Sequence, residues 1–375
     1  MNLLFSSIYN KFPKIPFTII LLVSLVACFG FVFMFSAAQG NINPWASRQM
    51  IYFSIAMPLM IAVSLVDIKY YYKFSYLFYY IALSFLVIVH LLGYTAMGAT
   101  RWIDLGLIKL QPSELMKIAI VFALARYFHD LGEQEIKLKH LIAPLIMLLI
   151  PAALIIKQPD LGTGIILLSL GVIIFFVAGV AKWVFVAGFI SASIALPLIW
   201  QFLYDYQKNR ILTFVDPSRD PLGGGYNIIQ SKIAIGSGGF SGKGIMKGTQ
   251  SQLQFLPEHQ TDFIFTMISE EWGFIGAGMI LMIFMILIFY CYIIAFNARS
   301  QFARLLAIGV TSMFCLHVFI NVAMVMGLLP AVGVPLPLLS YGGTMMITIL
   351  IAFGLVMNVN IHSRQNISNS LKNFF

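Results

Sequence analysis

The chain has 375 residues, of which 60% are hydrophobic and only 10% are charged, and its formal net charge is +9. Because a soluble domain carries about a quarter charged residues, this composition excludes an ordinary soluble protein and indicates one integral membrane domain over residues 1–375. In a membrane protein a positive excess mainly sets topology and contacts with membrane lipids, so we expect no nucleic-acid partner.

A membrane-spanning helix needs about 20 mostly apolar residues, and stretches of this kind recur along the chain. The candidate spans are 16–37, 50–66, 76–92, 112–128, 141–156, 162–180, 183–204, 263–295, 303–328 and 338–358. The predicted fold is therefore all-α and polytopic, with about ten transmembrane helices, the first retained rather than cleaved. The 263–295 stretch is too long for one crossing. Its first two turns, with Asp262, Glu270 and Glu271, should lie at the interface or line a cavity.

The distribution of Lys and Arg predicts the orientation, because short cytoplasmic connections are enriched in these residues. With the N-terminus inside, the inner connections hold Lys11, Lys14, Lys69, Lys73, Arg126, Lys137, Lys139, Lys182, Arg299, Arg304, Arg364 and Lys372. The short outer connections hold only Arg48, Arg101, Lys109 and Lys157. Both termini should then be cytoplasmic, in the inner membrane. The one large polar loop, 205–262 between helices 7 and 8, should be extracytoplasmic.

Charged side chains near the outer ends of the spans are the first candidate site, because such residues are costly in a membrane and usually functional. Glu114 and Lys117 are spaced i, i+3 and share one helix face. We favour a functional role for them over a structural ion pair. Arg48 and Arg101 could bind substrate or only reach lipid headgroups. Asp160 could join them or only cap the sixth helix.

Two features of the last spans have simpler interpretations. His317 and Asn321 are spaced i, i+4, and we interpret them as partners in interhelical hydrogen bonds rather than as metal ligands. Pro330, Pro335 and Pro337 break the chain before the last span, where they could shape a re-entrant turn or only a tight loop.

The large loop contains glycine clusters at 223–225 and 236–239. Such turns can offer backbone N–H groups to a phosphate, but a flexible surface loop is the default interpretation. Gly242-Lys243-Gly244 resembles the end of a Walker motif, yet Ser237 stands where the first glycine is required and Gly244 where a hydroxyl residue is required. ATP hydrolysis is therefore not supported.

Asp262 stands where the polar loop meets an apolar helix. From composition alone the favoured interpretation is a helix N-cap, where a carboxylate is stabilised by the helix dipole. A carboxylate held rigidly at the membrane edge can also accept a proton from a sugar hydroxyl or hold a cation. The two roles are compatible.

Short motifs occur in order along the whole chain. In the loop they are RILTF (210–214), DP (216–217), DPLG (220–223), GYNIIQS (225–231), GTQSQL (248–253), FLPE (255–258) and TDFIF (261–265). Elsewhere they are RWI (101–103), QPSE (111–114) with Lys117, QPDLGT (158–163) and PLLSYGG (337–343). Together they resemble the SEDS family (shape, elongation, division, sporulation), and the motifs at 248–253, 255–258 and 261–265 are similar to its RodA branch. Gln260 departs from the pattern, since the expected histidine stands one place earlier as His259, which weakens any histidine role.

The resemblance implies a peptidoglycan glycosyltransferase with ten spans, an outward-facing cavity and an essential aspartate matching Asp262. Such a protein polymerises lipid II on the outer face of the membrane and releases undecaprenyl pyrophosphate. Its implied partners are a class B penicillin-binding protein, which crosslinks the strands, and other membrane proteins of the elongation complex that gives cells their rod shape.

On this hypothesis Asp262 is the catalytic base, directly or through a divalent cation such as Mg or Mn. Cations should stabilise the departing pyrophosphate. The candidates are Lys117, Arg48, Arg101 and Arg210. Glu114 and Asp160 would orient these cations or contact the substrate.

Two other functions fit a polytopic protein. A lipid II flippase would need a polar pathway to both sides, whereas the polar chemistry is concentrated on one. A non-catalytic scaffold for the penicillin-binding protein would tolerate substitution of Asp262.

Overall fold

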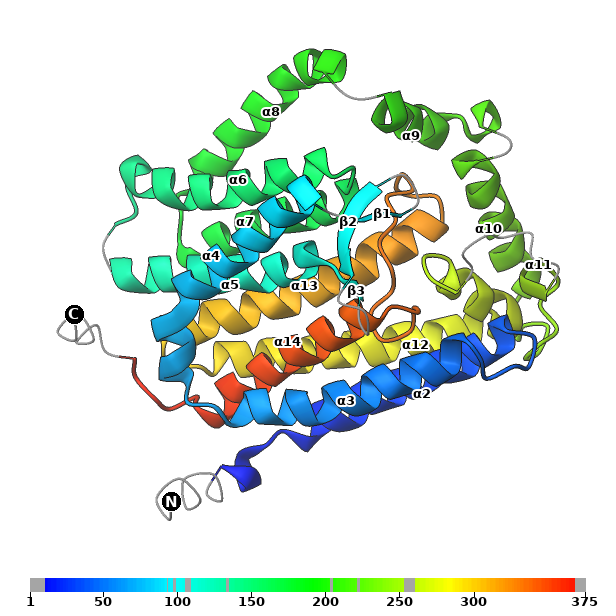
Figure 1. Cartoon of the computed structure of the whole chain (residues 1–375), viewed down its shortest axis with the longest axis horizontal. Helices are drawn as coiled ribbons and strands as arrows, with labels where there is room; N and C mark the ends of the chain where they lie inside the picture. Colours follow the sequence, from blue (N-terminus) through cyan, green and yellow to red (C-terminus); the bar gives the residue numbers. More distant parts are fainter. Residues whose placement is uncertain are drawn as a thin grey trace.

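The computed structural model describes residues 11–92, 94–96, 99–104, 109–132, 135–202, 205–220, 223–252 and 260–367. Its long helices form the bundle drawn in Figure 1. They are α2 (Phe17–Ala37), α3 (Trp45–Leu65), α4 (Ile68–Leu92), α5 (Pro112–Leu131), α6 (Ile142–Lys157), α7 (Leu161–Ala178), α8 (Lys182–Phe202), α12 (Ile264–Phe296), α13 (Gln301–Val325) and α14 (Gly343–Ile361). Each expected span corresponds in order to one of these helices, so the all-α polytopic prediction is confirmed.

Within the described residues, 8 helices are long and apolar enough to cross a membrane. The two remaining expected spans are α5 and α8. Helix α5 carries Glu114, Lys117 and Arg126, which make it less apolar than the others. In α8 the described apolar part is the shorter stretch Lys182–Ala195.

Helices α13 and α14 occupy the centre of the bundle. In each of them, 78% of the most apolar 18-residue stretch is buried inside the protein, compared with 22% in the peripheral α3. Helix α14 packs against α3, and α13 contacts α5, α7 and α12. By contrast α12 exposes Phe274, Met282 and Phe289 along its outer side, as expected for a helix that faces lipid.

The two described ends of the chain lie at the same end of the bundle. The side-chain amide of Asn360, near the end of α14, donates to the backbone carbonyl of Lys14, just before α2, at 3.1 Å. The helices of the polar segment lie at the opposite end (Figure 1). This agrees with an even number of crossings, while the side of the membrane on which each end lies stays a prediction.

The polar segment from 205 to 252 is largely helical. It forms α9 (Asp205–Val215), a short turn η3 (Pro217–Arg219), α10 (Gly224–Gly238) and α11 (Thr249–Gln252). The default interpretation of the glycine clusters as a flexible loop is wrong for Gly238, which lies in α10, and Gly242 is also held in place. A Cβ atom at either position would overlap the backbone of α12, so these glycines are needed for close packing.

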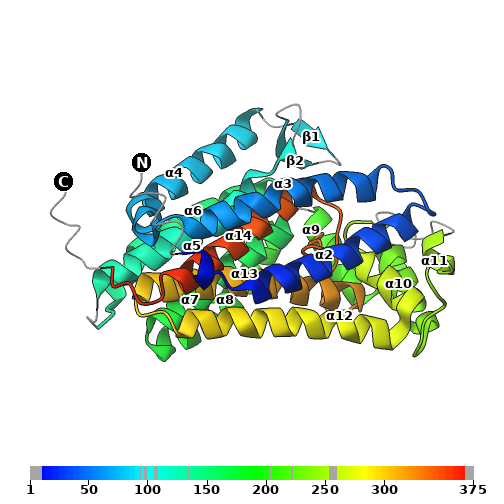
Figure 2. The same cartoon turned by 90° about the horizontal axis from the view of Figure 1, so that it is seen from below.

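Helix α12 is broken near its start, which explains why the stretch was too long for one crossing. Gly273 has φ 65° and ψ −161°, a conformation open to glycine but not to a helix interior. Figure 2 shows α12 running along one side of the bundle from its beginning beside α10 and α11. Of the early charged residues, Glu270 and Glu271 are 0% exposed and packed inside the protein, whereas Asp262 lines a cavity.

A small antiparallel sheet lies between α4 and α5, where the sequence suggested only a connection. Its strands are β1 (Tyr94–Ala96), β2 (Ala99–Asp104) and β3 (Lys109–Leu110), in that order. Strand β2 contacts α4 and α5, and so holds Arg101 beside the bundle. Two further short turns are η1 (Phe12–Lys14) and η2 (Leu138–Leu141).

Candidate functional site

A cavity of about 380 Å³ lies between the polar segment and the start of α12. Its lining comes from α9, α10, α13 and the chain around Asp262 and Gly333. The lining residues are Asn209, Arg210, Thr213, Asp220, Gly224, Asn227, Ile228, Asp262, Phe263, Met324, Ala331 and Gly333. The predicted base and one predicted cation, Arg210, therefore line the same cavity.

The backbone around Asp262 is fixed by α13 and by the segment that follows it. Asn321 donates to the Asp262 carbonyl at 2.8 Å. The Ser340 hydroxyl donates to the Thr261 carbonyl at 2.6 Å, and the Tyr341 amide donates to the Gln260 carbonyl at 2.9 Å. Consecutive peptide groups are thereby held in place, as a preorganised catalytic group requires.

Asp262 does not occupy the helix N-cap position that composition favoured. Helix α12 begins at Ile264, and its N-cap is Phe263, one residue after Asp262. The carboxylate lies beside Gly333, where a Cβ atom would come 3.4 Å from Asp262 Oδ2. Gly333 has φ +68°, so both its backbone conformation and its small size suit this position.

The cavity wall formed by η3 and α10 is ordered by Asp220. Its carboxylate accepts from the Gly224 amide at 2.7 Å, and its backbone carbonyl accepts from the Tyr226 amide at 3.2 Å. Asp220 therefore has a clear role as a turn-forming residue. Sequence reasoning did not select Asp220 or Asn227 as site residues, although both lie in motifs shared with the SEDS family.

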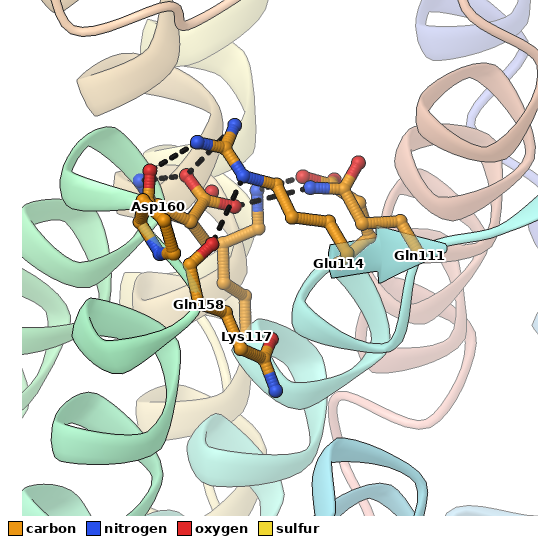
Figure 3. Close-up of polar contacts among 8 residues, drawn as sticks. Gln111, Glu114, Lys117, Gln158 and Asp160 are labelled. Carbon is orange, nitrogen blue, oxygen red and sulfur yellow. Dashed lines mark hydrogen bonds and ion pairs between the residues drawn. The ribbon is translucent and has the colours of Figure 1, made fainter. Parts of the chain in front are cut away.

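A second polar cluster surrounds Asp160, which is 2% exposed. Its carboxylate accepts from the Thr163 amide at 3.3 Å, so Asp160 caps α7, one of the two alternatives left open. Figure 3 shows Gln111 facing Asp160, to which it donates at 3.2 Å. Arg101 forms an ion pair with Asp160 at 4.0 Å and also donates to the Gln158 carbonyl at 3.2 Å. Capping and pairing with Arg101 thus occur together.

The third cluster is buried inside the bundle. Lys117 Nζ lies 2.7 Å from Glu114 Oε1 and 2.7 Å from His317 Nε2, and the lysine is 0% exposed. His317 Nδ1 is 2.7 Å from the Met313 carbonyl, which can only accept, so Nδ1 carries the proton and Nε2 accepts from Lys117. The ion pair between Glu114 and Lys117, which we had ranked below a functional role, is present, and the functional role stays a prediction. The predicted interhelical bonding of His317 is confirmed.

Helix α13 connects these clusters. His317, next to Lys117, and Asn321, next to Asp262, are one helical turn apart on α13. Gly162, just after Asp160, packs against the same segment as Asn321 does, since a Cβ atom there would come 2.7 Å from the Val332 carbonyl. The structure thus brings most of the predicted site residues to one end of the bundle.

Arg48 stands apart from these contacts. Its side chain is exposed in the first turn of α3. The motif residues 253–259, including His259, lie outside the described residues.

The proline-rich segment after α13 turns into the bundle without forming a helix. Leu336 and Leu339 are 0% exposed, and Gly30, in the middle of α2, packs directly against the Leu338 carbonyl. Its backbone is satisfied internally, for example by the Ser340 hydroxyl, which accepts from the Leu336 amide at 2.7 Å. Of the two interpretations left open for the prolines, this geometry fits the re-entrant turn.

The described residues contain no group of three or more His, Cys, Asp or Glu side chains arranged to hold a metal ion. Near Asp262 the other acidic residue lining the cavity is Asp220, which is already bonded to Gly224. This donor set does not fit a resident divalent cation.

Comparison with known proteins gives consistent matches over nearly the whole chain. Residues 16–365 match the FtsW/RodA/SpoVE family model, described as "Cell cycle protein". The chain is 38% identical over 365 residues to "Peptidoglycan glycosyltransferase MrdB" of Escherichia coli K12, covering 97% of each chain. It is similar to a chain solved under "Structural coordination of polymerization and crosslinking by a peptidoglycan synthase complex", with a TM-score of 0.82, 29% identity and coverage of 94% and 99%. The fold also matches the rod shape determining protein RodA of Thermus thermophilus, with a TM-score of 0.72, 24% identity and coverage of 94% and 98%.

Proposed function

The chain belongs to the FtsW/RodA/SpoVE (SEDS) family and is a RodA-like peptidoglycan glycosyltransferase, and we propose that it polymerises lipid II in the cavity lined by Asp262 and Arg210. The observation that carries the site assignment is that a carboxylate with a fixed backbone and a guanidinium line one cavity. A glycosyl transfer from a lipid pyrophosphate needs both, one to accept a proton and one to stabilise the leaving group.

The reaction joins two sugars. The 4-hydroxyl oxygen of one GlcNAc forms a bond to C1 of a MurNAc on another chain, while the bond from C1 to the pyrophosphate oxygen breaks. The hydroxyl proton passes to the Asp262 carboxylate, which later releases it to water. Because attack comes from the face opposite the leaving group, the α linkage of the donor becomes a β linkage in the glycan. Undecaprenyl pyrophosphate leaves with the bonding electrons.

Charge develops on the pyrophosphate as C1 is attacked. Arg210 is the side chain best placed to receive it, because guanidinium groups bind phosphate oxygens through paired N–H donors. Arg101, held by Asp160, and the exposed Arg48 are further candidates for the approach of the headgroup. Lys117 and Glu114 are buried in their own ion pair, so we propose that they contact substrate only if that pair opens, and otherwise hold α5 against α13.

The setting of the site suits a lipid-linked substrate. The exposed apolar sides of the helices can pack against the two lipid tails while the sugars enter the cavity. We propose that this end of the bundle faces outward. The related synthase complex couples polymerisation to crosslinking, so we also propose a class B penicillin-binding protein and other elongation-complex membrane proteins as partners.

The test is polymerisation of purified lipid II by the purified chain, with the glycan sized on a gel. Asp262→Asn, which keeps the shape of the side chain, should lower the rate by at least about 100-fold because the base is lost. Asp216→Asn is the matched control. Asp216 lies on the same polar segment, but its carboxylate faces Ser218, whose hydrogen bonds lower the pKa of Asp216. Normal polymer from Asp262→Asn would refute the base assignment. Absence of polymer from the unmodified chain, with lipid II moved across vesicles instead, would favour a flippase.

A further inference from the structure

The part of α12 that follows Asp262 is a separate short helix. Gly273 ends the helical conformation after residues 264–272, and the long lipid-facing part of α12 starts beyond it. Besides its contacts with α13 and the 330–342 segment, the position of Asp262 therefore depends on what holds this short helix, rather than on the long part of α12.

The connection between α10 and α11 closes over the break. The Lys243 and Gly244 amides donate to the carbonyls of Glu270 and Glu271 at 3.1 and 2.9 Å. The Phe274 amide on the other side of the break donates to the Gly239 carbonyl at 2.9 Å. This connection provides hydrogen-bond partners for backbone N–H and C=O groups that would be bonded within the helix if α12 were continuous.

Glu270 is the side chain at the centre of this arrangement. Its Oε1 lies 2.8 Å from Lys243 Nζ, 3.2 Å from Thr249 Oγ1 and 3.0 Å from the Gln250 amide. One buried carboxylate thus joins the short helix to Thr249 and Gln250, which precede Asp262 in the sequence. Its charge is compensated by Lys243, which is 26% exposed.

The neighbouring carboxylate has a different partner. Glu271 accepts from the Ser36 hydroxyl of α2 at 2.6 Å, and that hydroxyl in turn accepts from the Met246 amide at 3.2 Å. Trp272 packs edge-on against Phe33, also on α2, with ring centroids 4.9 Å apart. These contacts attach the end of the short helix to α2 and, through the Ser36 hydroxyl, to Met246, whereas Glu270 binds Thr249 and Gln250 directly.

We propose that Glu270 is a positioning residue for glycan polymerisation, which holds the short helix and the 243–250 connection together so that Asp262 keeps its place in the cavity. Glu270 is eight residues from Asp262, about 12 Å along a helix, and it does not line the cavity. It acts through the backbone rather than by touching substrate. This inference rests on the proposed role of Asp262.

The experiment compares variants in the lipid II polymerisation assay, with initial rates measured over a range of lipid II concentrations. Glu270→Gln keeps an acceptor oxygen for Thr249 and Gln250 but removes the charge that holds Lys243. We expect kcat to fall about 10- to 100-fold, as a small misplacement of a catalytic group does, with KM unchanged. Glu271→Gln is the matched control, because it alters an equally buried carboxylate that does not contact the 249–250 segment, and we expect it to keep a higher kcat.

Two further variants separate positioning from folding. Lys243→Met should lower kcat like Glu270→Gln. The kcat of the double variant should be no lower than that of the less active single variant, since both substitutions remove the same interaction. Thr249→Val removes the hydrogen bonds that an exposed hydroxyl makes with Glu270 and Lys243, so it should stay folded and lose kcat by a few-fold. Thermal unfolding in detergent is measured for all.

Wild-type kcat in Glu270→Gln would overturn the proposal, as would losses from Glu270→Gln and Lys243→Met that multiply. If the losses in kcat parallel the decreases in unfolding temperature and Thr249→Val keeps the wild-type kcat, Glu270 has only a structural role, and the proposal is also overturned. An active Asp262→Asn variant would instead refute the proposed base, so the two failures are distinguishable.

Discussion

The side-chain amide of Asn321 donates to the backbone carbonyl of Asp262 at 2.8 Å and, from the same nitrogen, to the carbonyl of Val334 at 2.7 Å. Asn321 is 0% exposed. This residue of α13 therefore ties the backbone of Asp262, the proposed base, to the re-entrant segment, and both carbonyls would lose a buried partner if the amide were removed.

Asn321→Leu should accordingly reduce both stability and rate. Each buried carbonyl left without a donor costs roughly 1–3 kcal/mol, and the freed Asp262 backbone should lower polymerisation further. Asn321→Asp should be at least as harmful, because a carboxylate would face two carbonyl oxygens. Thermal unfolding and lipid II turnover are the measurements, and a variant with normal turnover would show that Asp262 does not need this anchor.

Arg210 should contribute to the rate through its charge and its paired donors. A charged hydrogen bond is worth about 1.5–3 kcal/mol, so Arg210→Gln should lower kcat/KM for lipid II by about 10- to 100-fold. Arg210→Lys should recover part of the loss. Arg219→Ala is the control, since Arg219 lies on the same polar segment, is 60% exposed and pairs with Asp216. Equal losses in both arginine variants would remove Arg210 from the site.

The buried pair of Glu114 and Lys117 predicts a difference between single and double variants. Removing one partner leaves a buried charge uncompensated, at about 3–5 kcal/mol, whereas replacing both with neutral groups costs much less. Lys117→Met should therefore unfold at a lower temperature than Glu114→Gln/Lys117→Met.

Turnover then separates the two roles of this pair. If Lys117 contacts the pyrophosphate, the double variant should be folded but slow. A double variant with wild-type turnover would leave the pair a purely structural role.

The sequence was informative where chemistry depends on the periodicity of single helices. Apolar runs predicted every long helix, and the i, i+3 spacing placed Glu114 and Lys117 on one helix face, although we favoured a functional role over the ion pair that the structure shows. The sequence could not reveal hydrogen-bond partners that come from other helices. His317 completes the Lys117 cluster from α13, and nothing local in the sequence indicates that pairing.

The sequence also could not predict where the backbone departs from regular helix geometry. The excess length of the eighth stretch predicted that its first two turns lie at the interface or line a cavity, but it did not predict the break at Gly273, which packs against the α10–α11 connection. The same contacts order Gly238 and Gly239, which we had interpreted from the sequence as part of a flexible loop. Asp262 was selected from the sequence, yet its place one residue before the N-cap depends on the 330–342 segment, which is far along the chain.

Gly273→Ala should disturb the break on which this arrangement depends. Gly273 has φ +65°, and an added Cβ would overlap the Gly242 backbone nitrogen, so the strain should cost at least about 1–3 kcal/mol. Gly278→Ala is the control, because nothing lies within 4 Å of an added Cβ there, and alanine is the better helix former. Unfolding temperature and turnover are measured for both, and a harmless Gly273→Ala would mean that the break is not required.

The orientation of the bundle can be tested with single cysteines in a background whose native cysteines are replaced by alanine. Ser218, exposed in η3, and Lys139, exposed in η2, lie in connections that the charge distribution assigns to opposite sides of the membrane. In intact cells an impermeant maleimide should label Ser218→Cys, and it should label Lys139→Cys only after the membrane is permeabilised. The reverse pattern would place the Asp262 cavity on the cytoplasmic side, where a polymerase of external cell wall could not work, and would refute the proposed reaction whatever the variant kinetics.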